Sequence, residues 1–190
     1  MTKSFTEHEQ FNKVDFTQTG FPKGEYENCV FHSCSLPQTD LSNTIFSACQ
    51  FEDCDLSMAR LSGASFREVK FKNCKLMGLR FDECNKLLIS FSFDSCVLNF
   101  SSFYRLKLKS TIFKECKLQE VDFAECDLSK SSFHLCDMHH AMFDNTVLEG
   151  ADLRSAFNFS IDPETNKIKK AKFSAAGMAG LLNKYDIIIE

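Results

Sequence analysis

A five-residue repeat of large apolar side chains runs through most of this chain. Phe, Leu or Tyr stands at every fifth position from 11 to 81, and a second run, which includes one Met, continues from 88 to 153 after a slip of two residues. Nine of the ten cysteines stand two positions before one of these large residues, and the tenth, Cys84, lies in the slip. A period of five matches neither the 3.6-residue turn of an α-helix nor the two-residue alternation of a strand. The pattern therefore predicts neither an amphipathic helix nor a flat sheet.

The remaining arrangement is a solenoid that turns a corner every five residues. Each side would send one large and one small apolar side chain inward and leave three positions to solvent. The composition agrees with a narrow interior, because the chain has 21 Phe and no Trp. Internal repetition thus predicts one elongated core.

Charged residues indicate how many sides make one turn. Residues one turn apart lie about 4.8 Å from each other in a parallel stack, where opposite charges attract. A separation of 15 residues gives opposite and like pairs equally often, whereas a separation of 20 gives seven opposite pairs and one like pair, Arg60 with Arg80. Four sides per turn are therefore predicted. The opposite pairs are Asp40 with Arg60, Glu52 with Lys72, Asp55 with Lys75, Asp94 with Lys114, Arg105 with Glu125, Lys107 with Asp127, and Lys117 with Asp137.

Several repeats carry a family resemblance. Residues 54–58 (CDLSM), 126–130 (CDLSK) and 151–155 (ADLRS) are similar to the unit A(D/N)LXX, and over roughly residues 11–157 the chain resembles the pentapeptide-repeat proteins. The resemblance implies an all-β fold, a right-handed, four-sided β-helix. At 20 residues per turn it would have about seven coils and a length of about 35 Å.

The repeat also divides the chain. We expect a β-helix over residues 1–157, with regular repeats from about residue 11, and a capping or dimerisation segment over residues 158–190. The slip at residues 84–90 is interpreted as a tolerated insertion, with a partner-recognition loop as the alternative. In the C-terminal segment, residues 175–184 predict a short helix and residues 185–190 a strand, together a helix-plus-strand cap.

Cysteine and histidine patterns give no catalytic or metal site. Stacked thiols about 5 Å apart would exceed the usual Cβ separation of about 3.5 to 4.5 Å for a disulfide, so packed free thiols are predicted. The cysteine spacings are multiples of five rather than those of a zinc site. His134, His139 and His140 occupy outward positions while Cys136 points inward, which separates any nucleophile from a base. The sequence predicts a protein without catalysis, cofactor or metal, with a metal on the histidine pair as the alternative.

The C-terminal residues narrow the resemblance. The order of Lys172-Phe173, Leu181-Leu182 and the Ile triplet from Ile187 is similar to the end of the Qnr and MfpA type of quinolone-resistance proteins. That resemblance implies a homodimer joined through this end. It also implies a DNA mimic that binds DNA gyrase or topoisomerase IV and relieves fluoroquinolone action. The dimer junction would then contain Leu181, Leu182, Ile187 and Ile189.

Charge is unevenly distributed along the sequence. Residues 1–59 carry nine acids and three bases, residues 60–114 four acids and eleven bases, and residues 115–152 nine acids and two bases. The last zone contains acids without an opposite charge one turn away within the repeats, which are the predicted partner-binding surface. The basic middle departs from a uniformly negative DNA mimic. The predicted acidic residues are Glu120, Asp122, Asp144, Glu149 and Asp152.

Two functions therefore stay open. One is a topoisomerase-binding DNA mimic, and the other is a structural scaffold that binds an unidentified protein. Direct binding of nucleic acid through the basic middle is a weaker third, because that zone lacks interleaved aromatic residues. The first ten residues resemble neither a signal peptide nor a membrane span, so a cytoplasmic protein is expected.

Overall fold

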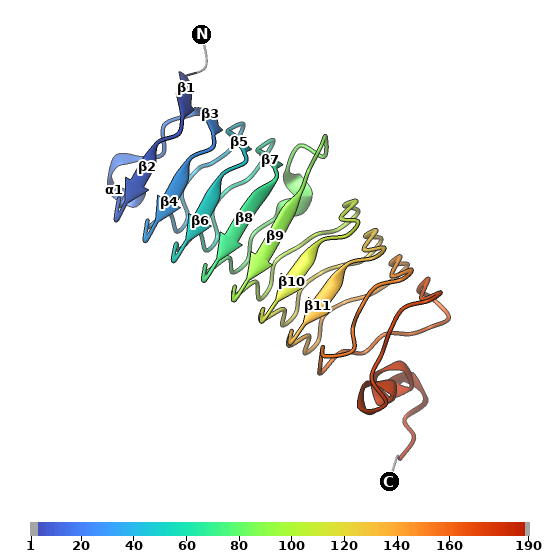
Figure 1. The fold of residues 1–190 in the computed structure, drawn as a ribbon. Coiled ribbons are helices and arrows are strands. Elements are labelled where there is room, and N and C mark those ends of the chain that lie inside the picture. The colour runs from blue at the N-terminus through green and yellow to red at the C-terminus, as the bar shows by residue number, and fades with distance from the viewer. Residues whose placement is uncertain (1–3, 189–190) are drawn as a thin grey trace.

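Parallel pairing between residues 20 positions apart organises the chain in the computed structural model, which describes residues 4–188. Seven steps of this pairing separate the first and last members of one unbroken column. The fold is the predicted right-handed, four-sided β-helix, about 34 Å long at about 4.8 Å per step (Figure 1). The column comprises Asp15, Ser35, Asp55, Lys75, Val97, Lys117, Asp137 and Phe157.

Four walls surround the core, and we number them by one representative coil. Wall 1 is centred on Phe31, wall 2 on Leu36, wall 3 on Leu41 and wall 4 on Phe46, all of which are buried. Each wall continues through the residues 20 positions away, or 22 positions away where a step crosses the insertion at residues 84–90.

Walls 1 and 4 form parallel sheets, whereas walls 2 and 3 are joined by single bridges. The sheet of wall 1 contains β2 (Gln10–Asn12), β4 (Val30–His32), β6 (Gln50–Glu52), β8 (Val69–Lys72), β9 (Phe91–Asp94), β10 (Ile112–Lys114) and β11 (Ser132–His134). The sheet of wall 4 contains β1 (Ser4–Glu7), β3 (Gly24–Glu27), β5 (Ile45–Ser47) and β7 (Ser65–Arg67).

Stacked Phe rings fill the centre of wall 1. The rings of Phe31 and Phe51 lie 4.6 Å apart with planes inclined by 7°. Those of Phe113 and Phe133 lie 5.0 Å apart with planes inclined by 5°. Burial of each ring contributes roughly 1.5–3 kcal/mol, so this stack is a main source of stability. The complete stack is Phe11, Phe31, Phe51, Phe71, Phe93, Phe113 and Phe133.

Corners are turned by residues in the left-handed backbone region. In one coil these are Asn28, Ser33, Gln38 and Asn43, with φ between 52° and 58°. Each stands two positions after an interior residue. A left-handed conformation costs a residue with a side chain roughly 1–2 kcal/mol, yet most corners here lack glycine. The surrounding pairing therefore imposes the corner geometry.

A helical turn replaces the regular geometry at the start of wall 2. Helix α1 (Phe16–Thr19) begins at Asp15, whose carboxylate accepts a hydrogen bond from the Thr17 amide at 3.0 Å. Gly20, with φ of 70°, ends it. An Asp cap and a terminal glycine are the usual signals at the two ends of a helix.

The register slip corrects one prediction from the sequence. Leu88 was expected to point inward, but its side chain is 68% exposed, and Leu87 is 64% exposed. Phe91 is buried instead, with its ring 5.1 Å from that of Phe81 and 5.5 Å from that of Phe66. The 3-10 helix η1 (Phe81–Glu83) precedes the slip. Because the larger aromatic ring fills the interior better than Leu88 would, the chain buries Phe91 and extends the leucines into solvent.

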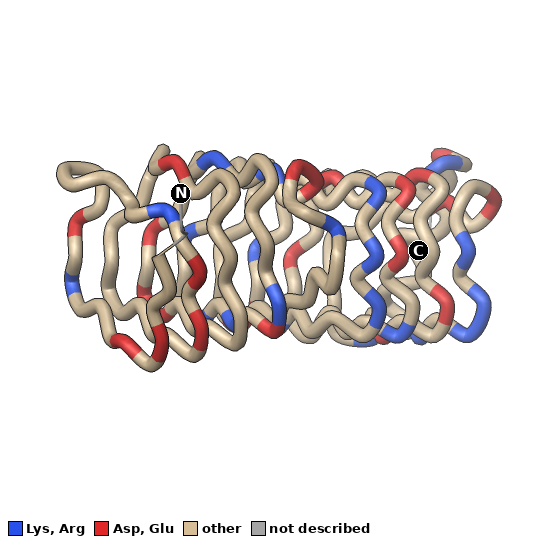
Figure 2. Tube along the Cα trace, turned by 90° about the horizontal axis from the view of Figure 1, so that it is seen from above, with Lys and Arg blue, Asp and Glu red and all other residues tan. Residues whose placement is uncertain are grey.

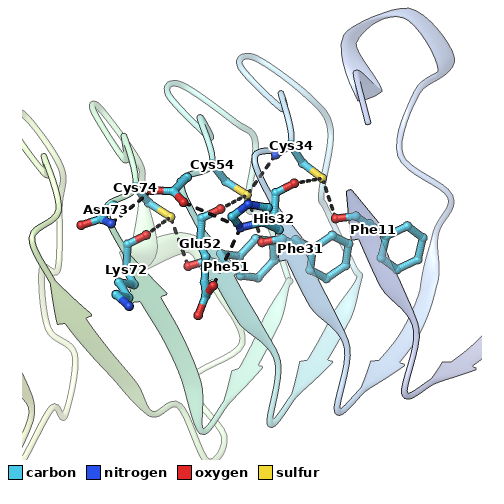
Figure 3. A network of polar contacts seen from close by, with 11 residues as sticks. Phe11, Phe31, His32, Cys34, Phe51, Glu52, Cys54, Lys72, Asn73 and Cys74 are labelled. Atoms are coloured by element: carbon cyan, nitrogen blue, oxygen red, sulfur yellow. Dashed lines mark hydrogen bonds and ion pairs between the residues drawn. The ribbon is translucent and has the colours of Figure 1, made fainter. Parts of the chain in front are cut away.

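The cysteines form buried columns of free thiols, as predicted. Cys34, Cys54 and Cys74 each donate through Sγ to a main-chain oxygen of the preceding coil at 3.3 Å (Figure 3). Burial raises the pKa of the Cys49 thiol to about 12. A desolvated thiolate is unfavourable, so this thiol stays protonated at neutral pH.

The C-terminal segment covers the last coil with helical turns. Backbone bridges still join Val147 to Lys167 and Asp152 to Lys172. The helix expected over residues 175–184 takes the form of two 3-10 helices, η2 (Ala176–Leu181) and η3 (Asn183–Tyr185). Gly180 lies so close to Phe159 that a Cβ at position 180 would collide with the carbonyl oxygen of Phe159.

The strand predicted over residues 185–190 is wrong for the part that the structure describes. Tyr185 ends η3, and residues 186–188 form no strand. Asp186 takes a left-handed φ of 49°, which turns the chain away from an extended path. The β-branched composition of this segment favoured a strand, but among residues 4–188 no pairing partner stabilises one here.

Candidate protein-binding surface

Charge on this rod is sorted by wall as well as by position along the sequence. Basic and acidic residues both occur from one end to the other (Figure 2). A linear window of residues averages all four walls, because the chain visits each wall once per 20 residues. The binding properties of a surface therefore depend on which wall a residue occupies.

Three of the five predicted acidic residues lie near one another. Asp122 belongs to wall 3, bridged to Ser102 on one side and Met142 on the other. Asp144 stands two positions after Met142, on the next coil of the same wall. Glu120 occupies the corner between walls 2 and 3, with a left-handed φ of 55°. We call Glu120, Asp122 and Asp144 the acidic cluster.

The cluster carries negative charge without ionic compensation. Within residues 4–188, none of its three carboxylates has a basic nitrogen within 4.0 Å. Asp122 accepts a hydrogen bond from the Ala124 amide at 2.9 Å, which holds its carboxylate against the wall. The neighbouring Glu125 is different, because Arg105 binds it at 2.6 Å. The cluster is thus a fixed negative feature bordered by one ion pair.

The other two predicted acids lie on other walls. Glu149 is on wall 4, one coil before Lys169, whose carbonyl oxygen accepts from the Gly150 amide. Asp152 is on wall 1, where Arg154 binds it at 2.7 Å. Hydrogen bonding to Arg154 lowers the pKa of Asp152 to about 2. Arg154 lies in the same coil as Asp152, so a search for opposite charges one turn away does not detect this pair, in which the two residues flanking Leu153 both point outward and meet.

Opposite charges one coil apart confirm four sides per turn. All seven predicted pairs occupy adjacent positions in the ladders. Four of them are ion pairs: Asp40 with Arg60, Asp55 with Lys75, Asp94 with Lys114, and Arg105 with Glu125.

The predicted dimer junction is only partly exposed. Leu181 is 8% exposed and packs into the protein's own core. Leu182 is half-buried, while Ile187 and Ile188 are exposed, the latter by 89%. Ile189 lies outside the described residues. The apolar surface at this end therefore comes from residues 182–188, with Leu181 supporting it from inside.

The histidine-rich repeat does not bring its thiol to an imidazole. The Cys136 thiol is fully buried and donates to the carbonyl oxygen of His134 at 3.6 Å. The His134 ring nitrogen Nδ1 meets the hydroxyl of Ser155 at 3.0 Å, and the rings of His139 and His140 lie 3.9 Å apart. Residues 4–188 contain no group of three metal-ligating side chains. The same residues include no helix long and apolar enough to cross a membrane.

The five-residue repeats show to which protein family the chain belongs. The model of the pentapeptide repeat region matches residues 5–81 and 86–157, and the gap between the two ranges falls at the insertion. The chain belongs to the pentapeptide repeat family.

Solved pentapeptide repeat proteins resemble the chain at low identity. The full-length structure of QnrB1, a plasmid-mediated fluoroquinolone resistance protein, is 17% identical over 97% of this chain and 100% of that chain, with a TM-score of 0.49. HetL, a pentapeptide repeat protein involved in heterocyst differentiation regulation from the cyanobacterium Nostoc sp. strain PCC 7120, is 16% identical. The match covers 90% of this chain and 86% of HetL, with a TM-score of 0.44. A search of curated proteins finds no match.

Proposed function

We propose that this pentapeptide repeat protein is a non-enzymatic DNA mimic that binds a type II topoisomerase, DNA gyrase or topoisomerase IV, and protects it from quinolone-type inhibitors. The acidic cluster would contact the basic surface on which the enzyme holds DNA. Such a partner would place the protein in the cytoplasm. No substrate is transformed and no cofactor is needed.

The observation that carries the proposal is the acidic cluster on a rigid wall. Its carboxylates lack ion-pair partners in the described chain, and two of them are fixed on consecutive coils of wall 3. A surface that binds DNA is rich in Lys and Arg, and its affinity comes largely from neutralising phosphates. Carboxylates on two consecutive coils offer such a surface the same kind of charge. Electrostatic complementarity of this kind speeds and orients association.

A homodimer would lengthen the rod. The exposed apolar residues at the C-terminal end include Ile187 and Ile188, and association through a twofold axis would cover the same residues on both copies. The acidic cluster lies in the C-terminal half of the solenoid. Joining the C-terminal ends would bring the two clusters toward the centre of a doubled rod.

A gyrase supercoiling assay with ciprofloxacin tests the proposed function. We expect the protein to restore supercoiling in the presence of the drug and to inhibit drug-free gyrase at higher concentration. A variant with Glu120→Gln, Asp122→Asn and Asp144→Asn should lose both effects by at least about tenfold, because each charge lost weakens complementarity. The matched control carries Glu7→Gln, Glu25→Gln and Glu27→Gln on wall 4, with the same change in net charge, and should keep both effects.

Two results of that assay would contradict the proposal. Gyrase and topoisomerase IV from the same organism could show no response to the wild-type protein. Alternatively, both triple variants could lose activity equally, which would indicate dependence on net charge rather than on the acidic cluster.

Sedimentation of an Ile187→Ser, Ile188→Ser variant tests the dimer. Both side chains are exposed, so the substitutions remove apolar contact area without disturbing the core. We expect a monomer, whereas the wild type should sediment as a dimer. A wild-type monomer, or a variant that stays dimeric, would contradict the proposed junction.

A second function, a scaffold for an unrelated protein, is favoured by an apolar strip at the corner of walls 2 and 3. Met58 and Phe100 are 59% and 54% exposed on either side of Gly78. Exposed apolar side chains grouped on a surface often mark protein contacts. A Met58→Ser, Phe100→Ser variant can be compared with the wild type in the same supercoiling assay. If the variant still protects gyrase from ciprofloxacin, this strip is not part of the topoisomerase contact.

A further inference from the structure

Wall 4 gathers lysines that are scattered in the sequence. The column of Lys107, Asp127, Val147 and Lys167 is joined by parallel bridges, so these residues stack on consecutive coils. Lysines also occupy outward positions beside this column in three of the same four coils. All six are exposed: Lys107, Lys109, Lys130, Lys167, Lys169 and Lys170. We call these six residues the lysine wall.

Little negative charge offsets the lysine wall. Between residues 107 and 170, wall 4 carries only two acids, Asp127 and Glu149. Asp127 is bound by Lys109 at 3.3 Å. Lys107 and Lys167 are three coils apart, about 14 Å at about 4.8 Å per coil. The protein has a net charge of −4, yet this wall presents a compact area with an excess of four positive charges, counted as six lysines less two acids.

The insertion adds exposed apolar side chains to the same wall. Asn85 and Ser90 donate backbone hydrogen bonds to Ala64 and Phe66, on and beside β7 of wall 4. Between them Leu87 and Leu88 extend into solvent next to Lys86. In Figure 1 this segment, in green, extends beyond the neighbouring coils at the edge that carries β1, β3, β5 and β7. The Leu87 amide donates to the side chain of Asn85 at 3.0 Å, which fixes the turn.

We propose that wall 4, from the insertion to Lys170, is a docking surface for an anionic lipid bilayer. Lysines would lie against acidic headgroups, and Leu87 and Leu88 would enter the boundary between headgroups and acyl chains. Clusters of four to eight basic residues and exposed apolar residues beside them are the two features that bind proteins to the surface of anionic membranes.

A nucleic acid fits this wall less well than a bilayer does. Single-stranded nucleic acid is held by aromatic side chains on which bases stack, together with arginine. In coils 107–170 wall 4 presents lysine, serine, valine and acidic side chains outward, and its outward positions contain neither an aromatic residue nor an arginine. Exposed leucines also gain nothing from contact with phosphates.

Vesicle co-sedimentation of the full chain tests this proposal. The probe is a vesicle of phosphatidylcholine with about one third phosphatidylglycerol, compared with phosphatidylcholine alone. We expect binding to the anionic vesicle and none to the neutral one. Each lysine near such a surface contributes about fivefold, so Lys167→Gln, Lys169→Gln, Lys170→Gln should weaken binding by about one hundredfold. Leu87→Ser with Leu88→Asn should weaken it by about tenfold, and Asn suits the left-handed φ of position 88.

The matched control is Lys70→Gln, Lys72→Gln, Lys117→Gln on walls 1 and 2. These lysines are exposed and the change in net charge is the same. This variant should bind vesicles within about twofold of the wild type. Equal losses in both lysine variants would overturn the proposal, as would equal binding to neutral vesicles. Binding of duplex DNA at physiological salt without vesicle binding would overturn it in favour of a nucleic-acid surface. Circular dichroism of each variant confirms that the fold is intact.

Discussion

Walls 1 and 4 receive the same two-residue insertion and respond differently. Wall 1 keeps its ladder, because Phe71 in β8 pairs with Phe93 in β9 and the two rings stack at 5.4 Å. Wall 4 has no strand after β7, and its bridges resume only with Lys107 and Asp127. A single side of one coil therefore absorbs the insertion. In a repeat protein each coil contacts only its neighbours, so an irregularity in one wall need not propagate to the others.

The largest effect should come from breaking the regular wall. Phe113→Ala removes a fully buried ring between Phe93 and Phe133. The loss of transfer free energy and the cavity left behind should lower the free energy of unfolding by about 3–5 kcal/mol. Urea denaturation measures this difference. A loss below about 1 kcal/mol would mean that the stack relaxes around the cavity and that wall 1 is less rigid than its ladder indicates.

A smaller effect should come from the irregular wall. Phe91→Ala removes the ring that fills the interior at the slip. The insertion beside it belongs to no sheet ladder and can partly close the space, so we expect a loss of about 2–3 kcal/mol. The matched change Leu88→Ala should alter the free energy of unfolding by less than about 0.5 kcal/mol, because that side chain is exposed. The same urea titration compares them. A larger loss from Leu88→Ala than from Phe91→Ala would reverse the assignment of the interior residue.

The smallest effect should come from the surface of wall 1. Arg154→Gln removes the partner of Asp152, whose pKa should rise from about 2 toward the ordinary value of about 3.9. Because this pKa is depressed in the folded protein, the pair stabilises above about pH 4, and that contribution disappears as the pH falls toward 2. At neutral pH the exposed pair should contribute less than about 1 kcal/mol. NMR titration of the Asp152 carboxyl group in both proteins checks the shift; an unchanged pKa would contradict the pairing.

The sequence predicted the fold because one periodicity carried two independent signals. The spacing of Phe and Leu gave the five-residue side, and opposite charges gave four sides per turn. The burial of Phe91 in place of Leu88 could not be predicted, since the period alone does not say which of several apolar residues near an insertion fills the interior. The left-handed backbone of the corners could not be predicted from the sequence either, because many residue types occupy these positions.

The candidate surface was predicted less well, for a geometrical reason. Linear zones of charge mix four walls, which is why Glu149 and Asp152 were grouped with three acids of another surface. The wall of each residue follows from its number modulo twenty once the turn is known, so Lys107, Lys130 and Lys170 could have been assigned to one wall. Helix α1 also had a readable signal, in Asp15 and Gly20 at its two ends. The last residues of the cap had none, because the isoleucines favour a strand and residues 186–188 form none in the structure.

At the N-terminal end of the described rod, the edge strands of walls 1 and 4 have one unpaired side. Among the described residues β1 pairs only with β3, and Phe11 stacks on Phe31 alone within the ring stack of wall 1. A further 20-residue coil with the same pattern, grafted before Phe11, would find both a ladder and a ring to continue. Under mechanical load the same end would peel away first, one coil at a time, because its outermost described strand is paired on one side only. The length of the rod can therefore be changed at its N-terminal end by adding or removing whole coils.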